Sequence, residues 1–284
     1  MRMSAFTQQS APNRHGVFAT ELKNYELPSF SGVVLSALET LRDPTATAES
    51  ASEILAADPG VSVKLLALAN SACFGLSRPV QSVAHAISLL GQTQVEAMLL
   101  SVAVSGVLPR SPIPQLKASQ FWRAAARRAV LARSLARLID RDHIHETFTA
   151  SLLQDMAIPL FAQLKSAEYG EVLEQWRSEQ LDLAELERQR FGWDHAMMGA
   201  WMCERWRFSD SLLRTIGAHH GLWAETELPA VTLVSCLTDA AGDDYGQAQF
   251  VQNVCDRYSL PEQDVADLIA HSAVEAAELS SLFV

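Results

Sequence analysis

Apolar side chains recur along most of this chain at intervals of three and four residues. In segment 28–42 such a series is formed by Phe30, Val33, Val34, Ala37, Leu38 and Leu41. This spacing places the side chains on one face of an α-helix, whereas strand-like alternation is absent from the sequence. The pattern predicts an all-α protein in which each helix buries one apolar stripe.

Proline, glycine and capping residues divide this pattern into separate helices. Asp58-Pro59 is a typical helix start, because aspartate accepts from free N–H groups and proline suits the first turn. The helices predicted in this way cover residues 28–42, 47–57, 59–70, 82–90, 92–108, 117–140, 145–164, 166–179, 182–191, 194–206, 209–220, 229–241 and 261–279.

The breaks between helices predict the domain organisation. Residues 1–24 are polar and lack periodicity, which indicates a flexible N-terminal tail. The segment Pro109 to Pro114 holds three prolines and cannot be helical, so we expect a boundary there. The predicted architecture is a two-lobe helical bundle with lobes at 25–110 and 115–245, followed by a C-terminal helical extension at 246–284.

Composition narrows the functional classes. The 284 residues carry a net charge of −11, which argues against a general binder of nucleic acid or anionic membranes. The four cysteines are far apart and indicate reduced thiols. No signal peptide is evident, and the longest apolar run, 97–108, is about half of a membrane span. We therefore expect a soluble cytoplasmic protein without membrane association.

The second half of the chain contains histidines and aspartates in an order that resembles the metal-binding series of HD-type phosphohydrolases. The series comprises Gln154, Asp155, His195, His219, His220 and Asp239. Gln154 stands where that series has a histidine, and the earlier helix reads Phe121-Trp122-Arg123-Ala124-Ala125, without histidine. Alanine cannot ligate a metal and glutamine does so weakly. We therefore predict a degenerate metal-site remnant with no bound metal, no cofactor and no catalysis.

Three further segments resemble the HDOD family, the HD-related output domains of bacterial signalling proteins. The segments are Asp58 to Ala72, Ala86 to Gly91 and Ser151 to Ala157, and the resemblance covers roughly residues 25–245. It implies an all-helical, HD-like fold and a regulatory role, often linked to two-component or cyclic-di-GMP pathways. In the first segment, Asn70-Ser71 is either a helix cap with a tight turn, in which asparagine tolerates a left-handed conformation, or a polar contact point between the lobes.

The remnant itself leaves alternatives open. Three or four of its residues are enough to hold a metal ion, so a reduced metal site is the alternative to a hydrogen-bonded polar core. Adjacent His219 and His220 point about 100° apart if both lie on a helix, so we do not expect both to face one centre.

Arg128 is the candidate for a cation that replaces the metal. On a helical projection of 117–140 it falls among apolar residues, one turn after Ala124. A buried guanidinium requires a carboxylate, and Asp155 and Asp239 are the candidates. The alternative is that Arg128 extends to the surface at the edge of the helix.

Five other arginines fall within one arc of about 120° on the same projection. They are Arg123, Arg127, Arg133, Arg137 and Arg141, with Ala124, Leu131, Leu135, Leu138 and Ile139 on the opposite side. The arc is either a solvated face paired with acidic residues or an anion contact for a phosphorylated partner, a cyclic dinucleotide or an RNA backbone. Aromatic residues do not interleave with it, which argues against stacking on single strands.

These observations favour a non-catalytic signal-transduction module that binds a protein partner or a small ligand. A metal-dependent phosphohydrolase or phosphodiesterase with a reduced metal site is the second hypothesis. A nucleotide or RNA binder that uses the arginine arc is the third. The sequence leaves the partner, the pathway and the oligomeric state open.

Overall fold

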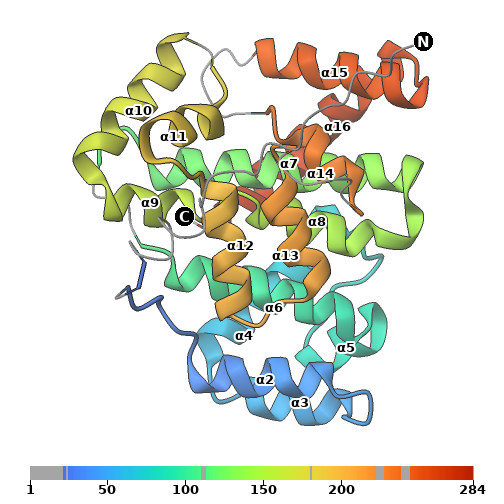
Figure 1. Cartoon of the computed structure of the whole chain (residues 1–284). Coiled ribbons are helices and arrows are strands. Elements are labelled where there is room, and N and C mark those ends of the chain that lie inside the picture. The colour runs from blue at the N-terminus through green and yellow to red at the C-terminus, as the bar shows by residue number, and fades with distance from the viewer. Residues whose placement is uncertain are drawn as a thin grey trace, which may run out of the picture.

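The protein consists of α-helices joined by short turns (Figure 1). The computed structural model describes residues 22–23, 25–109, 113–179, 181–221, 227–237 and 244–283. No β-strand occurs within these ranges, and the all-α prediction is confirmed. The predicted tail and Asp239 lie outside the described residues, apart from positions 22 and 23.

The helices follow in this order: α2 (Gly32–Arg42), α3 (Ala48–Leu55), α4 (Pro59–Ala69), the 3-10 turn η1 (Ala72–Phe74), α5 (Val83–Leu90), α6 (Gln92–Val107), α7 (Ala118–Ile139), the 3-10 turn η2 (Arg141–His143), α8 (Ile144–Leu153), α9 (Ile158–Leu164), α10 (Ser166–Glu179), α11 (Leu183–Phe191), α12 (His195–Arg205), α13 (Asp210–Ala218), α14 (Pro229–Val234), α15 (Asp244–Tyr258) and α16 (Glu262–Ser281).

Side-chain caps explain where several helices begin. The Asp58 side chain accepts a hydrogen bond from the Val61 N–H, and Thr47 does the same for Ser50. Asp182 and Asp194 cap α11 and α12 in this manner. Each cap satisfies one of the N–H groups that have no partner inside the helix. The sequence signals therefore correspond to real helix starts.

Two helices differ from the prediction. Segment 145–164 is not one helix, because Pro159 lacks an N–H and its ring is tolerated only in the first turn of α9. The resulting break leaves Gln154 and Asp155 in a turn after α8. Helix α15 was not predicted, because Phe250 and Val254 are the fully buried apolar residues among its described side chains and its other positions are largely polar.

The Asn70-Ser71 turn also differs from the left-handed asparagine cap that the sequence suggests. Asn70 caps α4 with φ −87°, so it is not left-handed, and the left-handed residue of this turn is Gly75 with φ 62°. The Asn70 amide bonds the backbone of Val80 twice, at 2.9 Å through its N–H and at 2.7 Å through its carbonyl oxygen. These bonds close the loop between α4 and α5.

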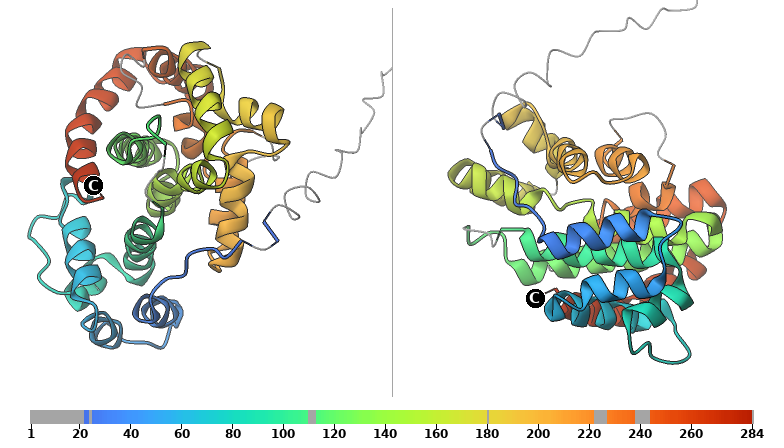
Figure 2. Two further views of the ribbon diagram at one scale, coloured as in Figure 1. Left: turned by 90° about the vertical axis from the view of Figure 1, so that its left-hand side faces the viewer. Right: turned by 90° about the horizontal axis from the view of Figure 1, so that it is seen from below.

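A continuous apolar core joins residues from both sides of the predicted boundary at 109–114. It extends from α2 through α13 and includes Ala276 and Leu279 of α16. A second cluster lies between α7, α14, α15 and α16. Figures 1 and 2 show α2 and α3 at one end of the molecule, α15 at the other, and α16 curving along one side towards η1. Helix α7 contributes to both clusters and is the central element.

No described helix is both long enough and apolar enough to cross a bilayer. No disulfide joins the four cysteines, all of which lie within the described residues.

Candidate metal centre

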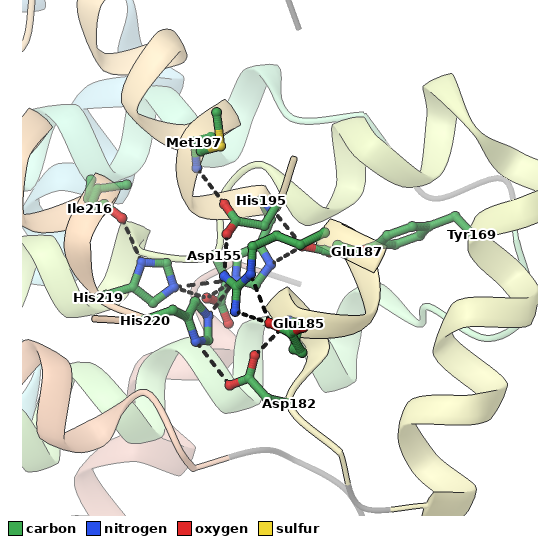
Figure 3. A network of polar contacts seen from close by, with 12 residues as sticks. Asp155, Tyr169, Asp182, Glu185, Glu187, His195, Met197, Ile216, His219 and His220 are labelled. Atoms are coloured by element: carbon green, nitrogen blue, oxygen red, sulfur yellow. Dashed lines mark hydrogen bonds and ion pairs between the residues drawn. The ribbon is translucent and has the colours of Figure 1, made fainter. Parts of the chain in front are cut away.

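Three chain turns converge on one centre (Figure 3). Asp155 follows α8, His195 is the first residue of α12, and His219 and His220 follow α13 directly. One donor atom from each of these four residues lies within 4.8 Å of all the others. A helix end thus fixes each donor near the same point.

The imidazoles approach one another through their Nε2 atoms. The Nε2 atom of His195 lies 3.3 Å from that of His219 and 2.9 Å from that of His220. Asp155 Oδ1 lies 3.4 Å from His195 Nε2 and 3.3 Å from His219 Nε2. The expectation that His219 and His220 do not both face one centre is wrong, because the Nε2 atoms of both rings approach that of His195.

The outer nitrogen of each imidazole faces an acceptor. His219 Nδ1 lies 2.6 Å from the carbonyl oxygen of Ile216, which only accepts, so Nδ1 carries the proton. His195 Nδ1 lies 2.7 Å from Glu187 Oε2, and His220 Nδ1 lies 3.3 Å from Asp182 Oδ2. These contacts favour rings whose Nε2 lone pairs point inwards. Metal-ligating histidines typically have outer partners of this kind.

Glu187 is a functional residue that the sequence analysis did not find. Its carboxylate is fully buried and accepts from both the backbone N–H and the ring Nδ1 of His195, each at 2.7 Å. The hydroxyl of Tyr169 donates to its other oxygen at 2.5 Å. The available signal was its position one turn after Leu183, on the buried face of α11. Burial and the neighbouring Glu187 charge raise the pKa of Tyr169 well above its usual value.

Charge at the centre follows from these neighbours. Burial opposes ionisation of Asp155, but the Arg128 charge outweighs it and holds the pKa of Asp155 well below its ordinary value. Burial likewise opposes the charged form of His195, yet Glu187 and Asp155 hold the pKa of His195 well above the usual range. Burial and the neighbouring imidazole of His219 lower the pKa of His220 to about 4, so His220 is neutral at pH 7.

Arg128 supplies a fixed positive charge beside the four donors. Its side chain does not extend to the surface, since the residue is only 4% exposed. Its Nη2 lies 2.6 Å from Asp155 Oδ2, and its Nη1 donates to the carbonyl oxygen of Leu237 at 2.9 Å. The two oxygens of Asp155 thus have different partners, because Oδ2 faces Arg128 and Oδ1 faces the imidazoles.

Gln154 is adjacent to the centre but is not one of its donors. The side chain is fully buried, and neither atom of its amide has a hydrogen-bond partner among the described residues.

The arginine arc does not form one solvated face. Arg123, Arg137 and Arg141 are exposed, and Arg127 is half-buried with its Nη2 donating to Gln247 at 3.0 Å. Arg133 is buried, and Leu138, expected on the apolar side, is 55% exposed. The physical reason is that α8, α14 and α16 all pack on α7, so the helix buries more than one stripe.

The family model of the HDOD domain matches residues 27–222. The chain belongs to the HDOD family. Solved structures share its fold: a provisionally named phosphohydrolase from Shewanella amazonensis SB2B has a TM-score of 0.73 at 20% identity, covering 94% of this chain and 98% of that one. An HDOD domain protein of unknown function from Geobacter sulfurreducens has a TM-score of 0.67 at 20% identity, covering 94% and 93%.

Two further relatives of this HDOD protein are longer than it is. A provisionally named signal transduction protein from Marinobacter aquaeolei VT8 has a TM-score of 0.69 at 16% identity, covering 95% of this chain and 65% of that one. An uncharacterised protein of Treponema pallidum (strain Nichols) is 23% identical over 209 residues, which are 69% of this chain and 38% of that protein. The chain thus spans less than half of that relative.

The donor set of this HDOD protein fits one metal ion. Zinc or a similar ion binds imidazole nitrogen at about 2.0–2.1 Å, which separates tetrahedral donors by roughly 3.3 Å. Three of the four donor separations given above are 3.3 or 3.4 Å. A second ion beside Asp155 Oδ2 would meet the Arg128 guanidinium. The residues therefore suit a single cation next to an arginine.

Proposed function

We propose that this HDOD protein is a signal-transduction module that acts by binding rather than by turnover. In this proposal its centre holds one divalent metal ion through His195, His219, His220 and Asp155, while Arg128 provides the charge of a second cation. The partner is a protein of a signalling pathway, and the site of action is the cytoplasm.

The observation that carries this proposal is the 2.6 Å contact between Arg128 Nη2 and Asp155 Oδ2. Two-metal hydrolysis requires two ions about 3.5–4 Å apart that together hold the attacking and leaving oxygens. A carboxylate that already serves a buried guanidinium is not available to a second ion. The guanidinium also repels such an ion, because the 4% exposure of Arg128 leaves little water to screen its charge.

A single bound ion would supply Lewis acidity and a fixed positive charge. The protein's own residues orient the donors: Glu187 holds the His195 ring, the Ile216 carbonyl holds His219 and Asp182 holds His220. Because these donors come from α8, α12 and the turn after α13, occupancy of the centre would tie three helices together. Such a link suits a regulatory module that signals through a change in its conformation.

The convergence of three imidazoles also supports a second candidate, a phosphodiesterase with a reduced metal site. Only turnover distinguishes it from the binding module, since both require the same ligands. Arg128 is the feature that favours binding over turnover, because it occupies Asp155 Oδ2 and so excludes the second ion that two-metal hydrolysis requires.

The test combines metal content with turnover on untagged protein purified without chelator. We expect about one manganese, iron or zinc ion per chain by plasma mass spectrometry, and strong loss of that ion in His219→Ala. Hydrolysis of bis(4-nitrophenyl) phosphate should stay at the rate of a metal-containing blank. Two ions per chain together with turnover would establish the phosphodiesterase instead, and no retained metal would refute the single-ion centre.

A further inference from the structure

Arg133 is a buried cation without a counterion. The residue is 5% exposed, and its Nε is sealed from solvent without a hydrogen-bond partner. No carboxylate among the described residues lies within ion-pair distance of its guanidinium. Its guanidinium lies over the ring of Phe74, whose centroid is 4.7 Å from Cζ. An uncompensated buried charge is strongly unfavourable, so this arrangement requires an explanation.

The Asn70-Ser71 segment holds Phe74 in this position. The Ser71 hydroxyl donates to the Leu68 carbonyl at 2.7 Å and lies 3.0 Å from Cys73 Sγ. The Asn70 amide closes the same loop on Val80. Phe74 also packs edge-on against Phe148, with ring centroids 5.2 Å apart. The ring is therefore a fixed platform, and its face attracts the guanidinium without neutralising it.

Other charged groups around Arg133 increase the local positive charge. Arg137 lies one turn further along α7, on the same face. Burial and the Arg137 charge lower the pKa of Arg133 to about 10. Burial and the charges of both arginines lower the pKa of His145, at the start of α8. Cys73 and then Glu275 of α16 oppose this shift by raising the pKa of Arg133, and Glu275 forms no ion pair with it.

We propose that Arg133 and Arg137 bind a phosphate dianion or a small phosphate monoester beside the Phe74 platform. Guanidinium groups bind phosphate through paired N–H···O bonds, and a dianion offers enough acceptors for two arginines. Only Nε is both sealed and without a partner, so the two terminal nitrogens of Arg133 reach solvent and are available to such a ligand. The site shares no residue with the metal centre.

The experiment measures binding by the full chain, using calorimetry with inorganic phosphate and with phosphoserine at matched ionic strength. Arg133→Met should weaken binding by roughly tenfold or more, because it removes charge-assisted hydrogen bonds. Arg133→Lys keeps the charge but loses the paired geometry and should be intermediate. Arg123→Met is the matched control, because it removes an exposed arginine from the same helix and should bind as the wild type does.

The variants also separate this proposal from pairing with Glu275. Arg133→Met removes an uncompensated charge and should therefore fold at least as stably as the wild type in chloride buffer. Glu275→Gln should bind phosphate more tightly. Binding of phosphoserine in preference to phosphate would identify a phosphorylated side chain as the source, and the reverse order would identify the free ion. Absence of binding by the wild type, or equal binding by Arg133→Met, would overturn the proposal.

Discussion

Two buried arginines on α7 have opposite surroundings. Arg128 meets the carboxylate of Asp155 at 2.6 Å, whereas Arg133 lies over an aromatic ring and forms no ion pair with a described residue. The cost of burial is the same in kind for both, but only the first is offset within the protein. At the scale of single residues, the position of a carboxylate thus decides whether a buried arginine is a structural or a binding group.

Replacing Arg128 with methionine should destabilise the protein by about 3–5 kcal/mol, because Asp155 would remain as a buried charge without its partner. The measurement is urea unfolding in the presence of a chelator, so that a bound ion does not compensate. Arg128→Met/Asp155→Asn should recover part of the loss, since neither charge then remains. Exposed Arg123→Met is the control and should change stability by less than about 0.5 kcal/mol. An Arg128→Met protein as stable as the wild type would contradict the cation-replacement hypothesis.

At the scale of elements, the pairing of α12 with α13 sets the centre. Gly199 lies on α12, and a Cβ atom there would lie 2.8 Å from Ile216 Cγ2 of α13. The same atom would lie 3.8 Å from the carbonyl oxygen of Gln154. Since α12 begins with His195 and α13 leads to His219, the close approach of these helices brings two ligands together. Glycine allows that approach because it lacks a side chain.

Gly199→Ala should therefore separate α12 from α13 and cost about 1–3 kcal/mol, the usual range for overpacking. The same variant should retain less metal after dialysis, because the donors would no longer meet at their present separations. Gly106→Ala is the matched control: it lies on α6 with no atom within 4 Å of the added Cβ. It should be neutral or stabilising by up to about 1 kcal/mol. Equal effects of the two substitutions would show that the close contact between α12 and α13 at Gly199 does not determine stability or metal retention.

At the scale of the whole molecule, α16 covers the central helix. Val265 lies in the second apolar cluster, and Ala276 and Leu279 lie in the first. Near its end, Phe283 stacks on Trp122 with ring centroids 4.8 Å apart. The helix thus contacts both apolar clusters and both ends of α7. Residues outside the family match at 27–222 are part of the packed structure of this protein.

Truncation after residue 260 should expose apolar surface on α7 and lower stability by several kcal/mol, at about 25 cal/mol for each Å² uncovered. The measurement is the urea midpoint together with binding of a hydrophobic dye. Phe283→Ala in the full chain should cost less, about 1–3 kcal/mol, because the Trp122 face is only partly uncovered. A truncated protein with the stability of the full chain would show that α16 is an appendage.

The candidate site could be predicted only in part from the sequence. The order of Asp155, His195, His219 and His220 identifies them as a group, and the helical projection indicates that Arg128 needs a carboxylate. Glu187 was missed because its role depends on how α11 lies against α12, which no spacing encodes. The expectation that His219 and His220 do not face one centre was wrong, because a helical angle between neighbours does not show how far two rings reach. Asp239 lies outside the described residues, and its part in the site stays a prediction.

The sequence by itself determined the helices, their caps and the family, because these depend on residues close together along the chain. Two elements show the limit of that information. Helix α15 depends on the burial of a few apolar residues, and the break before α9 depends on the single missing N–H of Pro159. Only the tertiary structure decided which oxygen of Asp155 faces Arg128 and which faces the imidazoles. It also decided that Arg133 lies buried with no described carboxylate within ion-pair distance. Whether a buried charge has a counterion depends on the distance between helices that are far apart in sequence, and packing sets that distance.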